Sequence, residues 1–208
     1  MNTPAVLPPE KRTLDRCLLW IDQVGAFLLC LADEVTIGGP VTDLPAADIS
    51  LLANLSRRHA TIARSGERYV IRAHAGTLVA DLPVHERTNL CDGQDLRLGD
   101  SVRLRFRIPN AKSGTARLDF GSSHRPRQTV NAIVLMHDTC LLGPSHDNHI
   151  VCPGWTNSIL LYRTEGRLWC RSVEELAFNG VASRDDTPLE DGTTVTGTNL
   201  CFRLEAVA

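Results

Sequence analysis

The chain of 208 residues lacks the marks of a membrane-spanning, secreted or nucleic-acid-binding protein. Its longest apolar runs are too short to cross a bilayer. The first residues, Met1 to Pro4, contain neither the charged nor the apolar segment of a signal peptide. The formal net charge is -2, so bulk electrostatics favours neither nucleic acid nor an anionic membrane. We therefore expect no nucleic acid and no membrane among its partners, and a cytoplasmic location.

The sequence also lacks the common catalytic motifs. It contains no Gly-x-Ser-x-Gly, no phosphate loop and no His-Glu-x-x-His. Ser56 and His59 lie only three residues apart at a predicted turn, which is a poor geometry for a Ser-His nucleophile. We expect a protein that is not an enzyme and that needs no cofactor.

Disulfides are not expected, although there are seven cysteines. The number is odd, and most of the cysteines lie within strand-like apolar runs, where cysteine behaves as a small hydrophobic residue. This pattern favours buried free thiols in a reducing compartment.

One tract has spacings that suit zinc, namely His137-x-x-Cys140 followed by His146-x-x-His149-x-x-Cys152. A tract of Cys and His alone is only a compositional hint, and two of its cysteines lie in strand-like runs. We expect no metal site, and the metalloprotein alternative stays open.

The hydrophobic pattern predicts strands throughout. Short apolar runs recur every eight to twelve residues, separated by Gly or Pro, and no long helical period occurs. Residues 17–21 and 26–31 flank a turn that ends in Gly25 and predict a hairpin. Residues 102–108 alternate apolar residues with Arg and predict a half-exposed strand with a basic outer face. The expected fold class is an all-β sandwich.

The second half of the chain repeats landmarks of the first half. Five landmarks recur at an offset of about one hundred residues, which is typical of a tandem repeat. Apart from Pro126, residues 122–128 contain no apolar side chain and form the best linker candidate. We therefore predict a flexible tail at 1–15, a first domain at 16–121, a linker at 122–128 and a diverged second sandwich at 129–208.

The segment from Ser56 to His59 concentrates binding chemistry on a turn before a predicted strand. A hydroxyl beside Arg suits phosphate, because the Arg guanidinium can donate two hydrogen bonds to one oxyanion. Gly38-Gly39 precedes this block, and the order of the landmarks that follow it resembles the forkhead-associated (FHA) domain. Those landmarks are Tyr69-Val70-Ile71, Gly76-Thr77, Leu90-Cys91-Asp92-Gly93 and Leu98-Gly99. FHA domains are β-sandwiches that bind phosphothreonine peptides through loops at one end.

The resemblance implies site residues one by one. It places Gly38, Gly39, Ser56, Arg57 and Arg58 at the phosphopeptide, and it gives His59 a supporting role beneath the loops. The family has Arg where Gly39 stands and Asn-Gly where Ala75-Gly76 stands, so two donors are missing.

The second repeat departs further from the family pattern. Pro144 stands at the position of the family Arg, and Ile159 at the position of the His. Thr156 and Asn157 replace Ser and Arg, while Asn179-Gly180 matches Asn-Gly. Thr156, Asn157 and Asn179 are therefore its candidate binding residues.

The leading hypothesis is a phosphothreonine-peptide adaptor in protein kinase signalling, weakened by the two missing donors. Its expected partner is a phosphorylated protein or peptide, with a Ser/Thr kinase or its substrate as the candidate. The alternative is a β-sandwich that binds its partner without phosphate or that has only a structural part.

Overall fold

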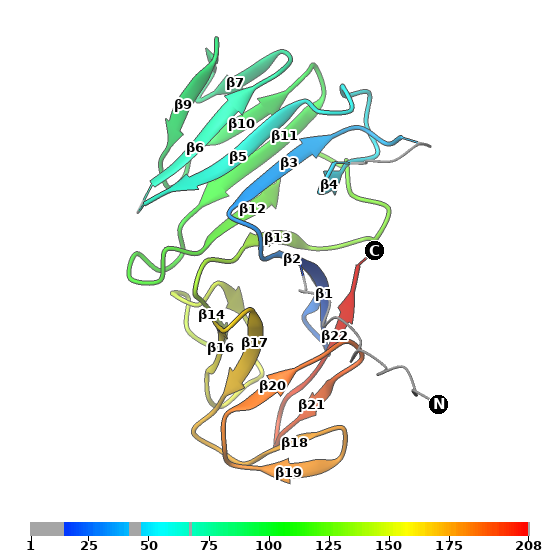
Figure 1. Ribbon diagram of the computed structural model, residues 1–208, viewed down its shortest axis with the longest axis vertical. Helices are drawn as coiled ribbons and strands as arrows, with labels where there is room; N and C mark the ends of the chain where they lie inside the picture. Colours follow the sequence, from blue (N-terminus) through cyan, green and yellow to red (C-terminus); the bar gives the residue numbers. More distant parts are fainter. Residues whose placement is uncertain (1–14, 42–46, 67, 208) are drawn as a thin grey trace, which may run out of the picture.

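The computed structural model describes residues 15–41, 47–66 and 68–207, and it builds them from strands and connecting turns (Figure 1). Among these residues we find no helix of the length and apolarity needed to span a bilayer. The predicted all-β class is confirmed. The predicted tail at 1–15 lies, except for Asp15, outside the described residues.

The N-terminal hairpin consists of β1 (Arg16–Ile21) and β2 (Gly25–Cys30), as the two apolar runs predict. The next eleven strands are β3 (Glu34–Gly38), β4 (Ile49–Ser50), β5 (Ala60–Ser65), β6 (Arg68–Ala73), β7 (Thr77–Val79), β8 (Leu82–Pro83), β9 (Arg87–Leu90), β10 (Asp95–Leu98), β11 (Val102–Arg107), β12 (Ala116–Phe120) and β13 (Ala132–Leu135). The last nine are β14 (Thr139–Gly143), β15 (Ile150–Val151), β16 (Ile159–Thr164), β17 (Arg167–Arg171), β18 (Leu176–Phe178), β19 (Val181–Ser183), β20 (Thr187–Leu189), β21 (Thr194–Thr196) and β22 (Cys201–Ala206).

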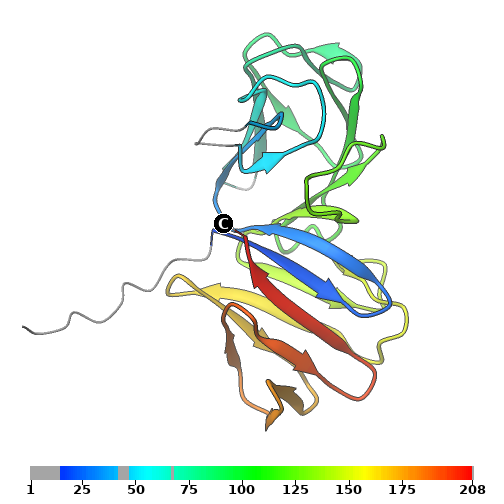
Figure 2. The ribbon, with the colours of Figure 1, turned by 90° about the vertical axis from the view of Figure 1, so that its right-hand side faces the viewer.

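The strands form three sheets. One sheet has twelve strands in the order β19-β18-β21-β22-β1-β2-β13-β12-β11-β10-β7-β8. Two five-stranded sheets have the orders β4-β3-β5-β6-β9 and β15-β14-β16-β17-β20. Two separate apolar cores lie between the long sheet and the two short ones, so the molecule contains two sandwiches (Figure 2).

The two sandwiches have the same strand order. Adding eleven to each number in β4-β3-β5-β6-β9 gives β15-β14-β16-β17-β20, and the same shift converts β8-β7-β10-β11 into β19-β18-β21-β22. This correspondence supports the predicted repeat, although descent of the second sandwich from an FHA domain stays a prediction.

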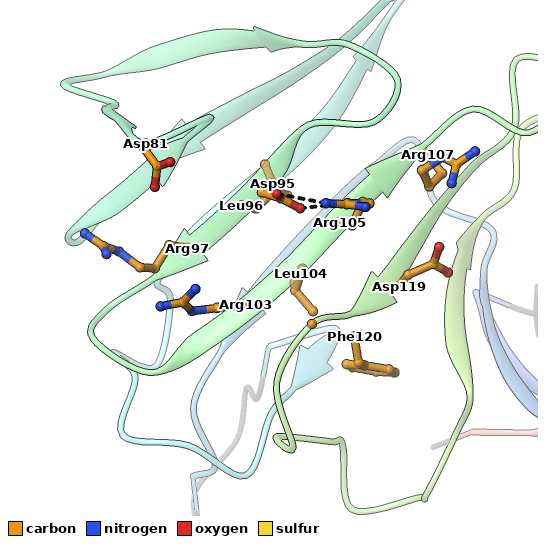
Figure 3. A pocket seen from close by; sticks show the side chains of 11 residues that line it. Asp81, Asp95, Leu96, Arg97, Arg103, Leu104, Arg105, Arg107, Asp119 and Phe120 are labelled. Carbon is orange, nitrogen blue, oxygen red and sulfur yellow. Dashed lines mark hydrogen bonds and ion pairs between the residues drawn. The ribbon is translucent and has the colours of Figure 1, made fainter.

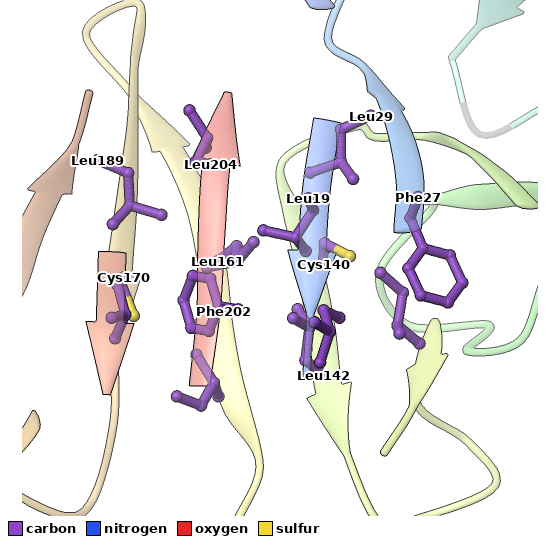
Figure 4. Packing of buried hydrophobic residues seen from close by; sticks show 14 of the residues in the cluster. Leu19, Phe27, Leu29, Cys140, Leu142, Leu161, Cys170, Leu189, Phe202 and Leu204 are labelled. Carbon is purple, nitrogen blue, oxygen red and sulfur yellow. The ribbon is translucent and has the colours of Figure 1, made fainter. Parts of the chain in front are cut away.

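Three strands at the middle of the long sheet serve both cores. In β1, Leu19 faces the second core and Leu18 faces the first, and the side chains of β2 and β13 alternate in the same way. A strand that is buried on both faces needs a nearly continuous apolar sequence. The runs Cys17-Leu18-Leu19 and Ala132-Ile133-Val134-Leu135 meet this need. Figure 4 shows β1 and β2 lying over strands of the second sandwich.

The strand pairings divide the chain differently from the sequence pattern. Hairpin β1–β2, which we expected in the first domain, pairs through β1 with β22, antiparallel, and through β2 with β13, parallel. The contiguous strands β3–β13 form the first sandwich, and β1–β2 together with β14–β22 form the second. The first sandwich is therefore inserted between β2 and β14 of the second.

The predicted linker at 122–128 also packs against the first sandwich. Leu52 N donates to Arg125 O at 2.9 Å, and Leu51 forms an isolated bridge with Pro126. This segment therefore connects β12 and β13 within the first sandwich, and the pairing of β2 with β13 joins the two sandwiches.

Candidate functional site

The candidate site lies on loops at one end of the first sandwich. The β4–β5 loop carries Ser56, Arg57 and Arg58, and all three residues are exposed. The β6–β7 loop and the β10–β11 turn approach the same end, because Gly99 N donates to Gly76 O at 2.9 Å. The structure thus brings together the three polar side chains that the sequence places there.

Gly38 and Gly39 have a different part from the one expected. Both are buried, and Gly39 N donates to Ser56 O at 3.0 Å. A Cβ on Gly38 would lie 1.9 Å from Arg57 O, and one on Gly39 would lie 2.4 Å from Leu55 O. The two glycines therefore support the β4–β5 loop from beneath, and their burial argues against direct contact with a ligand.

His59 lies under the loops, and its supporting role stays a prediction. Its side chain is buried, and its Nε2 lies 2.9 Å from Gly76 O. Its backbone carbonyl accepts hydrogen bonds from His74 N and Ala75 N. Gly99 N lies 3.1 Å from the same Nε2. When Nε2 carries the proton it can only donate, so Gly76 O then accepts hydrogen bonds from both His59 Nε2 and Gly99 N. The three loops therefore meet at Gly76 O, and Ser56 is not among the partners of the His59 ring.

The two arginines of the loop differ in their electrostatic surroundings. Arg58 forms an ion pair with Glu34 at 3.5 Å, and both side chains are about half exposed. No ion pair joins Arg57 to any residue that the structure describes. At Arg57, therefore, no carboxylate of an ion pair with the described residues competes with an incoming anion for the guanidinium.

In the second sandwich, the described loop 152–158 between β15 and β16 corresponds to the β4–β5 loop and contains no Lys or Arg. Thr156 Oγ1 accepts from Asn199 Nδ2 at 3.2 Å, and Asn157 is half-buried. A hollow of about 610 Å³ lies beside Trp155 and is lined by residues of the β1–β2 turn, residues 153–155 and residues 197–201. Asp22 is its one charged lining residue. This chemistry does not suit a phosphate.

Asn179 does not belong to this end of the second sandwich. Asn179 and Gly180 form the tight turn between β18 and β19, with φ of 49° and 84°. Asn179 N donates to Thr194 O, at the end of β21 away from the 197–200 loop. The Asn-Gly pair is a hairpin turn that favours positive φ at both positions. Its assignment as a binding loop is therefore corrected.

The Cys and His tract has structural partners. His149 Nδ1 accepts from Leu141 N at 2.8 Å, and its Nε2 is hydrogen-bonded to Ser113 Oγ. Burial raises the pKa of Cys140 and of Cys152 to about 12, so neither is a ready thiolate. Within the described ranges no cluster of three or more potential metal ligands occurs. All seven cysteines are free, and five of them are buried.

A second feature, the outer face of β10, β11 and β12, is only partly predictable from the sequence. The predicted alternation of 102–108 is confirmed, since Arg103 and Arg105 are exposed between buried apolar residues. The register between the strands places further charged residues beside these arginines, and the sequence periodicity does not predict that register. Together these side chains line a hollow of about 570 Å³ (Figure 3).

Sequence comparisons find neither a matching family model nor a matching curated protein. Comparison with solved structures finds Mycobacterium tuberculosis EmbR in complex with a low-affinity phosphopeptide, at 28% identity over 45% of this chain, with a TM-score of 0.34. The match spans 24% of the EmbR chain.

Two further similar structures are FHA domains. The FHA domain of Chlamydia trachomatis CT664 is 25% identical over 40% of this chain and 89% of its own, with a TM-score of 0.30. The second FHA domain of the M. tuberculosis ABC transporter Rv1747 is 22% identical over 62% of this chain and 94% of its own, with a TM-score of 0.35.

Proposed function

We propose that the first sandwich binds phosphothreonine peptides through Ser56 and Arg57, as an adaptor in protein kinase signalling. The proposal rests on the exposed hydroxyl of Ser56 beside Arg57, which has no ion-pair partner among the described residues. The backbone of their loop is fixed by a hydrogen bond from Gly39 N to Ser56 O. A phosphorylated kinase or kinase substrate is the partner class that this chemistry fits.

The phosphate would receive hydrogen bonds from the Ser56 hydroxyl and from the Arg57 guanidinium. Hydrogen bonds in which the donor or the acceptor is ionised are shorter and stronger than neutral ones. Gly39 N donates a hydrogen bond to Ser56 O, and His59 is hydrogen-bonded to Gly76 O of the neighbouring loop. These contacts order the backbone of the loops before the ligand binds. A site that is ordered before binding loses less conformational entropy when the ligand binds.

Binding should be weak, because two family donors are missing. Gly39 supplies no guanidinium and Ala75 supplies no side-chain amide. A hydrogen bond to a charged group contributes about 1.5–3 kcal/mol. The loss of both donors therefore weakens binding by about a hundredfold or more, at about 1.4 kcal/mol per factor of ten.

Titration calorimetry with a phosphothreonine peptide and its unphosphorylated twin tests the proposal. We expect binding of the phosphorylated peptide alone, and a loss of at least about tenfold in the Ser56→Ala, Arg57→Ala double variant. Affinity should fall with added salt, because an exposed ion pair is screened. Arg87→Ala, an exposed arginine on strand β9, is the matched control and should bind like the wild type.

Equal affinity for the two peptides, unchanged in the double variant, would contradict phosphate binding. The favoured function would then be the alternative, a sandwich that binds its partner without phosphate.

A further inference from the structure

The outer face of β10–β12 carries five arginines, and three of them are neutralised. Arg105 Nε donates to Asp95 at 2.8 Å, Arg107 Nε to Asp92 at 3.1 Å, and Arg117 Nε to Asp119 at 2.7 Å. Each of these carboxylates is matched to one guanidinium. The remaining two are Arg97 and Arg103.

Arg97 and Arg103 lie directly opposite each other on neighbouring antiparallel strands. Both are exposed, and no ion pair joins either of them to the part of the chain that the structure describes. Like charges directly opposite on a sheet are destabilising. Both line the 570 Å³ hollow, and Figure 3 shows their side chains beside each other at one end of it. Asp81 lines the same hollow without an ion pair to either arginine.

We propose that Arg97 and Arg103 form a binding site for a phosphate monoester, separate from the Ser56 loop. Two adjacent guanidinium groups match a phosphate dianion in charge, whereas a single carboxylate would neutralise only one of them. The nearby carboxylates Asp95 and Asp119 are already paired, so they oppose the ligand less. The volume of the hollow lies in the range of small-ligand sites.

The site does not depend on the proposed function. Its two arginines project from the outer face of the long sheet, while Ser56 and Arg57 lie on the β4–β5 loop at the end of the sandwich. The phosphate can come from a phosphorylated side chain of a partner protein or from a small phosphate ester, because the recognised group is the same.

NMR titration with inorganic phosphate, observed at the arginine Nε–H signals of the full chain, tests the site. The protein carries Ser56→Ala and Arg57→Ala, so that the loop contributes nothing, and sodium chloride keeps the ionic strength constant. We expect saturable shifts at Arg97 and Arg103, and a loss of affinity of at least about tenfold in Arg97→Gln, Arg103→Gln. This variant should fold, because it removes a repulsion.

The chain offers a matched control. Arg72 and Arg87 are also exposed and directly opposite each other, but on β6 and β9 of the other sheet and outside the hollow. Arg72→Gln, Arg87→Gln removes the same charge and should leave phosphate affinity within about twofold of its starting value. An equal loss in both pairs, or shifts that chloride reproduces, would overturn the proposal by showing only general attraction of anions.

Two further titrations separate the sources of the phosphate. One uses a phosphoserine peptide without threonine, and the other uses ribose 5-phosphate. Tighter binding of the peptide supports a phosphorylated protein, and tighter binding of the sugar phosphate supports a small ester. Failure of inorganic phosphate and of both esters to shift Arg97 or Arg103 would refute the site, whatever the result at Ser56.

Discussion

Cutting the chain between residues 122 and 128 tests how the two sandwiches are joined. A protease site inserted after the exposed Ser123 would divide the chain into two fragments after folding. If each sandwich were built from one half of the chain, the fragments would separate. Because hairpin β1–β2 belongs to the second sandwich and β13 to the first, we expect them to stay together.

The expected strength follows from the side chains that cross the cut. The N-terminal fragment gives the second core five large apolar residues, and the C-terminal fragment gives the first core three. They are Leu19, Ile21, Phe27, Leu29 and Leu31, and Val130, Ile133 and Leu135. A fully buried side chain of this kind contributes about 1.5–3 kcal/mol, so the gross gain is about 12–24 kcal/mol. Association costs about 4–15 kcal/mol. The middle of both ranges leaves about 8 kcal/mol, a Kd near 1 µM.

The assay is size-exclusion chromatography of the cleaved protein, with urea unfolding of the cut and uncut chains beside it. At protein concentrations well above 1 µM, about the expected Kd, the fragments should elute as one species and separate only in denaturant. Phe27→Asp places a charge in the second core and should release the fragments, whereas Gln23→Asp in the β1–β2 turn should not. Separate elution of unsubstituted fragments in native buffer would refute the shared sheet.

The sequence is informative about which segments are strands, and less so about their partners. Alternation and turn residues predict the β1–β2 hairpin and the half-exposed β11, because both signals are local. The apolar runs of β1, β2 and β13 also indicate burial on both faces. Which strand covers each face depends on contacts between residues more than one hundred positions apart, such as Leu19 with Leu204. Local periodicity does not contain that information.

The candidate site shows the same division. The block Ser56-Arg57-Arg58-His59 is a contiguous signal, and the structure places its first three residues on the surface and His59 beneath them. The error at Asn179 came from matching Asn-Gly to a binding loop, although this dipeptide is also the strongest short hairpin signal. The Arg97–Arg103 pair was not predicted, because it depends on the register between β10 and β11.

Two further predictions concern one glycine and one histidine. Gly39→Arg restores the family residue, but the new Cβ would lie 2.4 Å from Leu55 O. We therefore expect this substitution to lower the free energy of unfolding by about 1–3 kcal/mol and not to tighten peptide binding. Urea unfolding checks this, with Gly76→Ala as a neutral control, since a Cβ there meets no atom within 4 Å. Burial, with Arg117 nearby, lowers the pKa of His149 to about 4, below its ordinary 6.5. As the pH falls from 6.5 to 5, the unfolded chain binds a proton at His149 that the folded chain does not bind, so this histidine should lower the free energy of unfolding by about 1.6 kcal/mol. The drop in stability should be smaller in His149→Asn. It should persist in the control His146→Asn, because His146 is exposed. Equal drops in both variants would show that His149 is not the group responsible.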